Sequence, residues 1–188
     1  AARGGVIVVE ADDIELKDNA SLTATGKTGG GAVLVGGDWQ GGANTERRVF
    51  DNPNAIKEAT TVTMGKGALI DVSAIASGDG GTAVLWSDIS NASSVTLAQG
   101  SIFADGGQSG GDGGFVETSG FALAVRDMTV STKSVNGKTG QWLLDPRDIT
   151  IADGTDSGVD GDYTATADNA FIDVATLVAA LATTNIKV

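Results

Sequence analysis

The residues of this chain best suited to chemistry are carboxylates. Four lie close together near the C-terminal end: Asp153, Asp156, Asp160 and Asp162. Carboxylate oxygens are preferred Ca²⁺ ligands, so these four form a candidate calcium site. Their spacing does not match an EF-hand and lacks its distal glutamate, which favours a solvated turn. Apart from this candidate calcium, the sequence predicts no metal and no cofactor.

A second group of charged residues would suit polysaccharide cleavage. Paired carboxylates can run a glycosidase, and the candidates here are Asp88, Asp145, Arg147 and Asp148. An acidic chain always carries many carboxylates, however, and no aromatic-lined cleft is evident. The sequence therefore favours a non-enzymatic protein with no catalytic residue, and a carbohydrate-active enzyme is kept as the alternative.

The composition excludes several other classes of function. The 188 residues include no histidine and no cysteine, which removes imidazole and thiol catalysis and the usual zinc sites. The formal charge of −12 argues against nucleic acid as a partner, because phosphate binding needs clustered lysine and arginine. No apolar run reaches the length of a membrane span. No signal peptide is visible, and the chain is interpreted as a fragment of a longer protein.

Repeated glycine-rich turns organise the chain. Two to four Gly or Asp residues come before each of several short apolar strands, as in GGGAVLV (29–35), GDGGTAVLW (78–86) and GDGGFVET (111–118). A turn followed by the same kind of strand, several times over, predicts a single β-solenoid over 1–188. The glycines are expected to form tight corners, with each Asp capping its own backbone.

Alternating apolar residues predict which side chains face the core. The pattern points inward the pairs Ile14 and Leu16, Val62 and Met64, Val95 and Leu97, and Leu123 and Val125. Trp39, Trp86 and Trp142 each lie in or just after a strand that starts a coil. They are expected to belong to one aromatic ladder, with burial favoured over an exposed sugar-binding row.

Two segments depart from the repeat. An insertion at about 40–59 carries Arg47, Arg48 and an exposed-looking Phe50, which makes it a candidate ligand loop. The alternative is a plain crossover that packs on the coil. The pattern loosens over 153–182, where residues 173–182 predict one short helix capped by Asp173. Asn19 and Asn91 lie in N-x-S/T sequons and are candidate glycosylation sites.

Several motifs together resemble a known family. They are GGGAVLVGGDWQG (29–41), GALIDVSA (67–74), GDGGTAVLWSD (78–88), GGDGGFVETSG (110–120) and GQWLLDPRDITI (140–151). Taken together, they are similar to the large exoproteins of bacterial two-partner secretion, the filamentous haemagglutinins and high-molecular-weight adhesins. The resemblance covers nearly the whole chain.

This resemblance implies a right-handed parallel β-helix secreted to the surface of a Gram-negative cell. It implies a role in virulence or biofilm formation, through attachment to a host receptor, a glycan or a matrix polysaccharide. The outer-membrane transporter would recognise a domain outside this fragment. Related exoproteins capture haem carriers or deliver toxins, so a passive stalk of such a protein is a further alternative.

Overall fold

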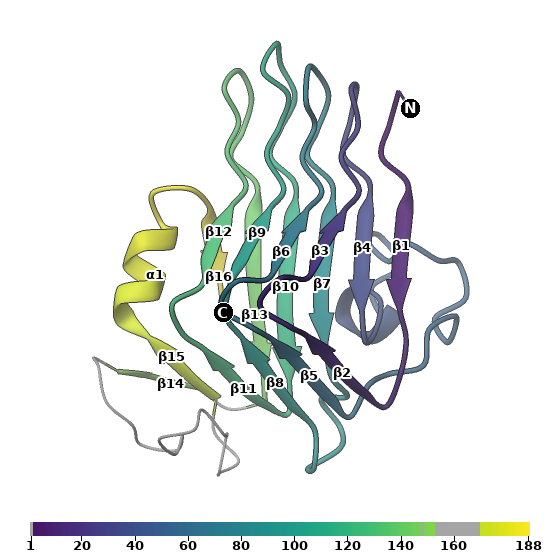
Figure 1. Cartoon of the computed structure of the whole chain (residues 1–188), viewed down its shortest axis with the longest axis vertical. Helices are drawn as coiled ribbons and strands as arrows, with labels where there is room; N and C mark the ends of the chain where they lie inside the picture. The colour runs from purple at the N-terminus through teal and green to yellow at the C-terminus, as the bar shows by residue number, and fades with distance from the viewer. Residues whose placement is uncertain (1, 148, 153–169) are drawn as a thin grey trace.

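The computed structural model describes residues 2–147, 149–152 and 170–188, and its strands form three parallel sheets (Figure 1). The chain is therefore a parallel β-helix, as the sequence predicts. Sheet A has six strands. Its strands, in spatial order, are β1 (Val6–Val9), β4 (Ala32–Val35), β7 (Thr82–Trp86), β10 (Phe115–Gly120), β13 (Gln141–Pro146) and β16 (Asn185–Lys187).

Sheets B and C complete each turn of the coil. Sheet B runs in the order β14 (Ile149–Ala152), β15 (Ala170–Asp173), β11 (Ala122–Val125), β8 (Val95–Ala98), β5 (Thr61–Met64) and β2 (Asp13–Leu16). Sheet C contains β12 (Thr129–Ser131), β9 (Ser101–Phe103), β6 (Leu69–Asp71) and β3 (Ser21–Thr23). From β1 to β12 the chain visits sheets A, B and C in turn, so each strand pairs with its counterpart one rung away.

The glycine-rich segments lead from sheet C to sheet A, and they are wider than tight turns. Figure 1 shows them as a row of loops that project beyond the strands. The two legs of each loop meet at its base, where Gly81 N donates to Val72 O and Gly114 N donates to Ala104 O. A Cβ on Gly114 would lie 2.1 Å from the carbonyl oxygen of Gly81. Glycine is therefore required there by the close approach of neighbouring backbones.

The acidic residues of these loops bond across rungs, contrary to the expectation that each caps its own backbone. Asp79 Oδ1 accepts a hydrogen bond of 2.7 Å from the amide of Asp112. Asp112 Oδ1 in turn accepts one of 2.8 Å from the amide of Lys138. The carboxylates thus tie each loop to the next, which explains why Gly and Asp recur together without invoking a metal.

The core is a narrow column of small and branched side chains. Val33, Leu85 and Val116 from sheet A are fully buried and meet Val62 and Leu123 from sheet B. The inward pairs expected at Ile14 and Leu16, Val62 and Met64, and Leu123 and Val125 are confirmed. Every strand contributes only a few side chains, so stability depends on the rungs stacking in register.

In strand β8 the side chains that face the core are not the predicted ones, so the prediction for Val95 and Leu97 is wrong. The buried residues of β8 are Thr96 and Ala98, while Val95 and Leu97 are only partly buried. Thr96 is tolerated inside because its hydroxyl group donates to the Ser119 carbonyl oxygen at 2.8 Å and hydrogen-bonds to Ser87 Oγ at 2.9 Å. Apolar alternation alone cannot reveal a polar residue whose hydrogen bonds are all made inside the coil.

The three tryptophans do not form one ladder. Trp142 is fully buried within the coil, where its Nε1 donates to Thr118 Oγ1 at 3.1 Å. Trp39 and Trp86 belong to a second, separate cluster with Leu34 and Val84. Their burial was predicted correctly, but the two groups lie on opposite faces of sheet A because Trp86 and Leu85 are adjacent on one strand.

The C-terminal end differs from the regular rungs. Strand β15 lies between β11 and β14 in sheet B, so the chain leaves β13, forms β14 one position further out, and returns to fill the gap. The helix α1 (Val174–Ala180) follows and is capped by Asp173, as expected from the sequence. It packs beside β12 (Figure 1), and Thr183 Oγ1 donates to the Val130 carbonyl oxygen at 2.6 Å. The helix therefore covers the last edge of sheet C.

Candidate functional site

The insertion between β4 and β5 folds back onto the outward face of sheet A. It begins with a short helical turn, η1 (Trp39–Gly42), and closes where the amide of Ala59 donates to the carbonyl oxygen of Gly36 at 2.9 Å. The insertion and the sheet enclose the second hydrophobic cluster: Leu34, Trp39, Ile56, Val84, Trp86 and Leu143. The segment expected at 40–59 is thus an ordered platform with its own core, and it packs on the coil as the alternative interpretation held.

Asp38 holds the first half of the insertion together. Its side chain is almost fully buried and accepts hydrogen bonds from the amides of Trp39, Val49 and Phe50 at 2.8 to 2.9 Å. A single carboxylate therefore satisfies three donors that the irregular backbone would otherwise leave unpaired. Such charge-assisted bonds are among the stronger ones in proteins. They fix the backbone on both sides of residues 43–48, most of which are exposed.

Glu117 joins the insertion to sheet A from below. Its side chain projects from β10 into the interface and has no exposed surface. Glu117 Oε2 accepts from the amide of Gln40 at 2.9 Å, and Oε1 accepts from Ser119 Oγ at 2.8 Å. The pKa of Glu117 is raised to about 8, mainly by burial. The two hydrogen bonds lower it, and the nearby carboxylates of Asp145 and Asp38 make smaller upward contributions.

A second glutamate closes the insertion. Glu58 Oε2 accepts from the indole Nε1 of Trp86 at 3.1 Å, close to where the chain re-enters sheet B. Partial burial raises the pKa of Glu58, while the bond from Trp86 lowers it and the charge of Asp88 adds a smaller increase. The two glutamates bracket the second cluster, so the insertion is anchored by polar contacts at both ends.

Arg47 and Phe50, two of the three predicted ligand-loop residues, lie differently from what their sequence suggests. The guanidinium carbon of Arg47 lies 3.7 Å from the ring centroid of Phe115 and 5.9 Å from that of Trp39. Phe50 was expected to be exposed, but it packs against the second cluster because the insertion needs apolar side chains to cover sheet A. Arg47 is exposed.

Arg48 plays a different part from Arg47. Its Nη1 donates to the carbonyl oxygen of Gly42 at 3.3 Å, within the insertion itself. The two neighbouring arginines therefore separate into one that braces the loop and one that lies over an aromatic ring of the sheet. No ion pair links Arg47 to any carboxylate among the residues described.

Three hollows share Phe115 as a lining residue, and together they are called the groove. One hollow is lined by Trp39, Glu46, Arg47, Thr82 and Phe115. A second shares Thr82 and Phe115 and continues to Arg3 and Asp79. A third shares Phe115 and extends over Lys138, Gln141 and Asn185. Residues of the insertion thus line the first hollow, and residues of the glycine loops line the other two.

The predicted catalytic candidates that the structure describes, Asp88, Asp145 and Arg147, each have a different structural partner. Asp88 Oδ1 accepts from the amide and hydroxyl groups of Ser90 and so caps a turn. Asp145 Oδ2 accepts from Gln40 Nε2 at 3.4 Å beneath the insertion. The guanidinium of Arg147 lies 4.9 Å from the Phe121 ring centroid. Asp148 lies outside the described residues. Glu117 has the raised pKa of a general acid, but a substrate cannot touch a side chain with no exposed surface.

The candidate calcium ligands Asp153, Asp156, Asp160 and Asp162 also lie outside the described residues. Within the described part of the chain, no group of three or more His, Cys, Asp or Glu side chains is placed to hold a metal ion. No helix in this part is long and apolar enough to cross a bilayer.

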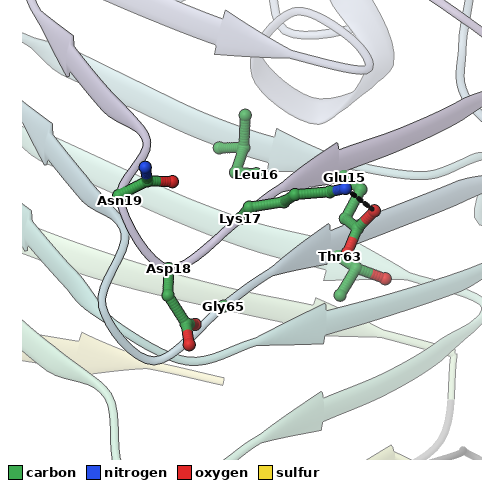
Figure 2. Close-up of a pocket in the computed structure, with 7 residues that line it drawn as sticks. All are labelled: Glu15, Leu16, Lys17, Asp18, Asn19, Thr63 and Gly65. Atoms are coloured by element: carbon green, nitrogen blue, oxygen red, sulfur yellow. Dashed lines mark ion pairs between the residues drawn. The ribbon is translucent and has the colours of Figure 1, made fainter.

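The glycosylation candidates differ in access. Asn19 is exposed at the turn after β2, beside a shallow hollow lined by Glu15, Lys17 and Asp18 (Figure 2). Lys17 Nζ lies 3.8 Å from Glu15 Oε2 there, and both side chains are largely exposed. Asn91 is partly buried, and its Oδ1 accepts from the amide of Ser93 at 3.0 Å. Modification of either asparagine stays a prediction, with Asn19 the more accessible.

Sequence reasoning missed Asp38 and Glu117, the two carboxylates that seat the insertion. The sequence pattern predicts that both face solvent. Glu117, for example, lies between Val116 and Thr118, which are buried, so alternation along the strand places it on the outward face. The available signal was indirect: a long insertion rich in Trp, Val, Phe and Ile needs an apolar surface to cover, and polar residues trapped below it must then be paired. No protein-family model matches the chain, and no curated protein matches it significantly.

Proposed function

We propose that this β-helix is a non-enzymatic, adhesive segment of a large secreted bacterial surface exoprotein of the two-partner secretion type. The observation that carries the proposal is the ordered insertion, with its own core, on the outward face of a rigid parallel stack. Binding surfaces commonly lie on loops that a rigid scaffold positions. Here the platform presents an exposed arginine and a groove beside it.

The likeness of the glycine-loop and strand motifs to filamentous haemagglutinins supports the cellular setting. In that setting the protein lies at the cell surface or is released from it, after export through an outer-membrane transporter that engages a different domain. The partner is a host receptor, a surface glycan or a matrix polysaccharide. The acidic surface, with 24 carboxylates against 12 lysines and arginines, suits an extracellular protein that must stay soluble.

A surface-retention assay with two arms tests this function. The chain, coupled to fluorescent beads, is applied to epithelial cells and to biofilm matrix, and beads carrying the unfolded chain serve as the control. We expect retention that depends on folding. Equal retention of folded and unfolded chain would contradict adhesion, and would leave a passive stalk.

The second arm tests the enzymatic alternative. Acidic and neutral polysaccharides are incubated with the chain, and reducing ends and unsaturated products are measured. We expect no product. Turnover that the substitution Asp145→Asn or Asp88→Asn abolishes would overturn the non-enzymatic function in favour of a carbohydrate-active enzyme.

A further inference from the structure

We propose that the groove beside the insertion binds a sparsely charged acidic glycan, in which a sugar carboxylate is held by Arg47 and neighbouring neutral sugars lie along the first outward row of sheet A. This inference rests on the adhesive function and names the chemical class of its ligand. The inference is based on the side chains that surround Phe115, where residues of the insertion lie close to the glycine loops.

Arg47 supplies the anion-binding group. Stacking at 3.7 Å on Phe115 holds the guanidinium flat, while the side chain stays exposed and forms no ion pair within the described residues. A planar guanidinium presents paired donors that match a carboxylate, and stacking on a ring reduces the entropy lost when those bonds form. The position is therefore organised before any ligand arrives.

The register of sheet A supplies the rest of the groove. Thr82, Phe115, Gln141 and Asn185 are aligned on successive strands, at the first position of β7, β10, β13 and β16. All four side chains are at least partly exposed. A chain laid along the stack would meet one of them every rung, about 4.8 Å apart. Asn185 Nδ2 already donates to the carbonyl oxygens of Thr139 and Gly140, so Asn185 offers its Oδ1 as an acceptor. This oxygen, the Thr82 hydroxyl group and the Gln141 amide group can bond to sugar hydroxyl groups at this spacing.

The backbone amides of this row already donate hydrogen bonds within the protein, which favours a glycan over a peptide as the ligand. The amides of Thr82, Phe115 and Gln141 donate to the carbonyl oxygens of Gly31, Gly81 and Gly114 at 2.9 to 3.1 Å. An extended peptide would therefore find no free strand edge to pair with. A ligand must use side-chain hydrogen bonds, stacking and the guanidinium, which are the contacts that a sugar chain makes.

The charges along the groove set the expected charge density of the glycan. Arg3, Arg47 and Lys138 line it, and so do Asp79, Asp112 and Glu46. Positive and negative groups balance, so a continuous polyanion would gain no net attraction and would be repelled near each carboxylate. A glycan that alternates acidic and neutral sugars fits better, because its carboxylate can meet Arg47 while neutral sugars lie beside the aspartates.

Titration calorimetry on the whole chain tests this site. The probes are a hyaluronan octasaccharide, its carboxyl-reduced counterpart, dextran sulfate and poly-glutamate. We expect binding of the octasaccharide and a loss of about tenfold or more after carboxyl reduction, after Arg47→Gln and after Arg47→Lys, since the lysine keeps the charge without the planar fork. The matched control Lys17→Gln removes an exposed cation away from the groove and should leave affinity within about twofold.

Several results would overturn the glycan site. They are no binding of the octasaccharide, equal losses for Arg47→Gln and Lys17→Gln, dextran sulfate binding as tightly as the octasaccharide, or poly-glutamate competing on equal terms. The last would indicate an acidic peptide as the ligand. If beads that carry Arg47→Gln are retained on cells like the native chain, this site fails while adhesion stands. If neither is retained, adhesion itself fails.

Discussion

The amide of Gln40 donates a hydrogen bond of 2.9 Å to Glu117, a residue 77 positions further along the chain. Gln40 adopts φ 50 and ψ 46, a left-handed conformation that costs a non-glycine residue about 1 kcal/mol or more. Its side chain also reaches Asp145. The buried carboxyl of β10 thus compensates for a strained turn in the insertion, and this contact joins the platform to the coil.

The stability of the protein should fall as the pH rises from about 4.5 to about 8. The pKa of Glu117 is raised to about 8 in the folded state from an ordinary value of 4.5, so folding favours the protonated form. The stabilisation is complete below pH 4.5 and is lost as the pH rises through 8. Over this range the shift corresponds to at most about 5 kcal/mol.

Urea unfolding at pH 5, 7 and 9 measures this effect, with Glu117→Gln as the matched variant. The amide keeps the size and one acceptor oxygen for the Gln40 amide, and its NH2 group can donate to Ser119 Oγ. Because it does not titrate, its stability profile should be flatter and should lie above that of the native chain at pH 9. Parallel profiles for the two proteins would show that Glu117 is not the titrating group.

Removal of the Asp38 carboxylate should destabilise the insertion and leave the coil folded. In Asp38→Ala the amides of Trp39, Val49 and Phe50 lose their acceptor, and each unpaired buried donor costs about 1–3 kcal/mol. Hydrogen exchange of these three amides should accelerate about tenfold or more, while protection of β7 and β10 is retained. Exchange that rises equally in the insertion and the sheets would contradict a separately anchored platform.

The glycine loops give a test of close backbone packing. A Cβ at position 114 meets the Gly81 carbonyl oxygen at 2.1 Å, so Gly114→Ala should destabilise the protein by more than about 2 kcal/mol. Gly5→Ala is the control, since nothing lies within 4 Å of its Cβ position. Thermal unfolding of the two variants should differ sharply, and similar melting temperatures would mean that the loop bases are not close-packed.

The facing of β8 can be tested by exchanging hydroxyl and methyl groups. Thr96→Val removes the bonds to Ser87 and Ser119 inside the coil and should cost about 1–3 kcal/mol although it adds a hydrophobic group. Val95→Thr, at a partly buried position on the other face, should cost less than about 1 kcal/mol. A larger loss of unfolding free energy for Val95→Thr than for Thr96→Val would instead indicate that Val95 faces the core, as the apolar alternation predicts.

Much of this architecture could be predicted from the sequence, because a solenoid repeats its local rules. The glycine loops, the parallel rungs, the insertion and the helix beginning after Asp173 all follow from patterns of turns and apolar residues. The interior hydroxyl of Thr96 and the separate burial of Trp39 and Trp86 do not, because they depend on partners far away in the sequence. The seating of the insertion was hidden for the same reason, since Asp38 and Glu117 become buried only when the loop folds over them.

Hydrogen exchange of the native chain, free and bound to a surface that retains it, tests most directly whether the protein adheres through the insertion. We expect added protection in the insertion near residues 43–50 and around Thr82 and Phe115 of sheet A, with sheets B and C unchanged. Protection confined to sheets B and C would contradict adhesion through the insertion, because binding would then occur away from the platform that Gln40 and Glu117 hold in place.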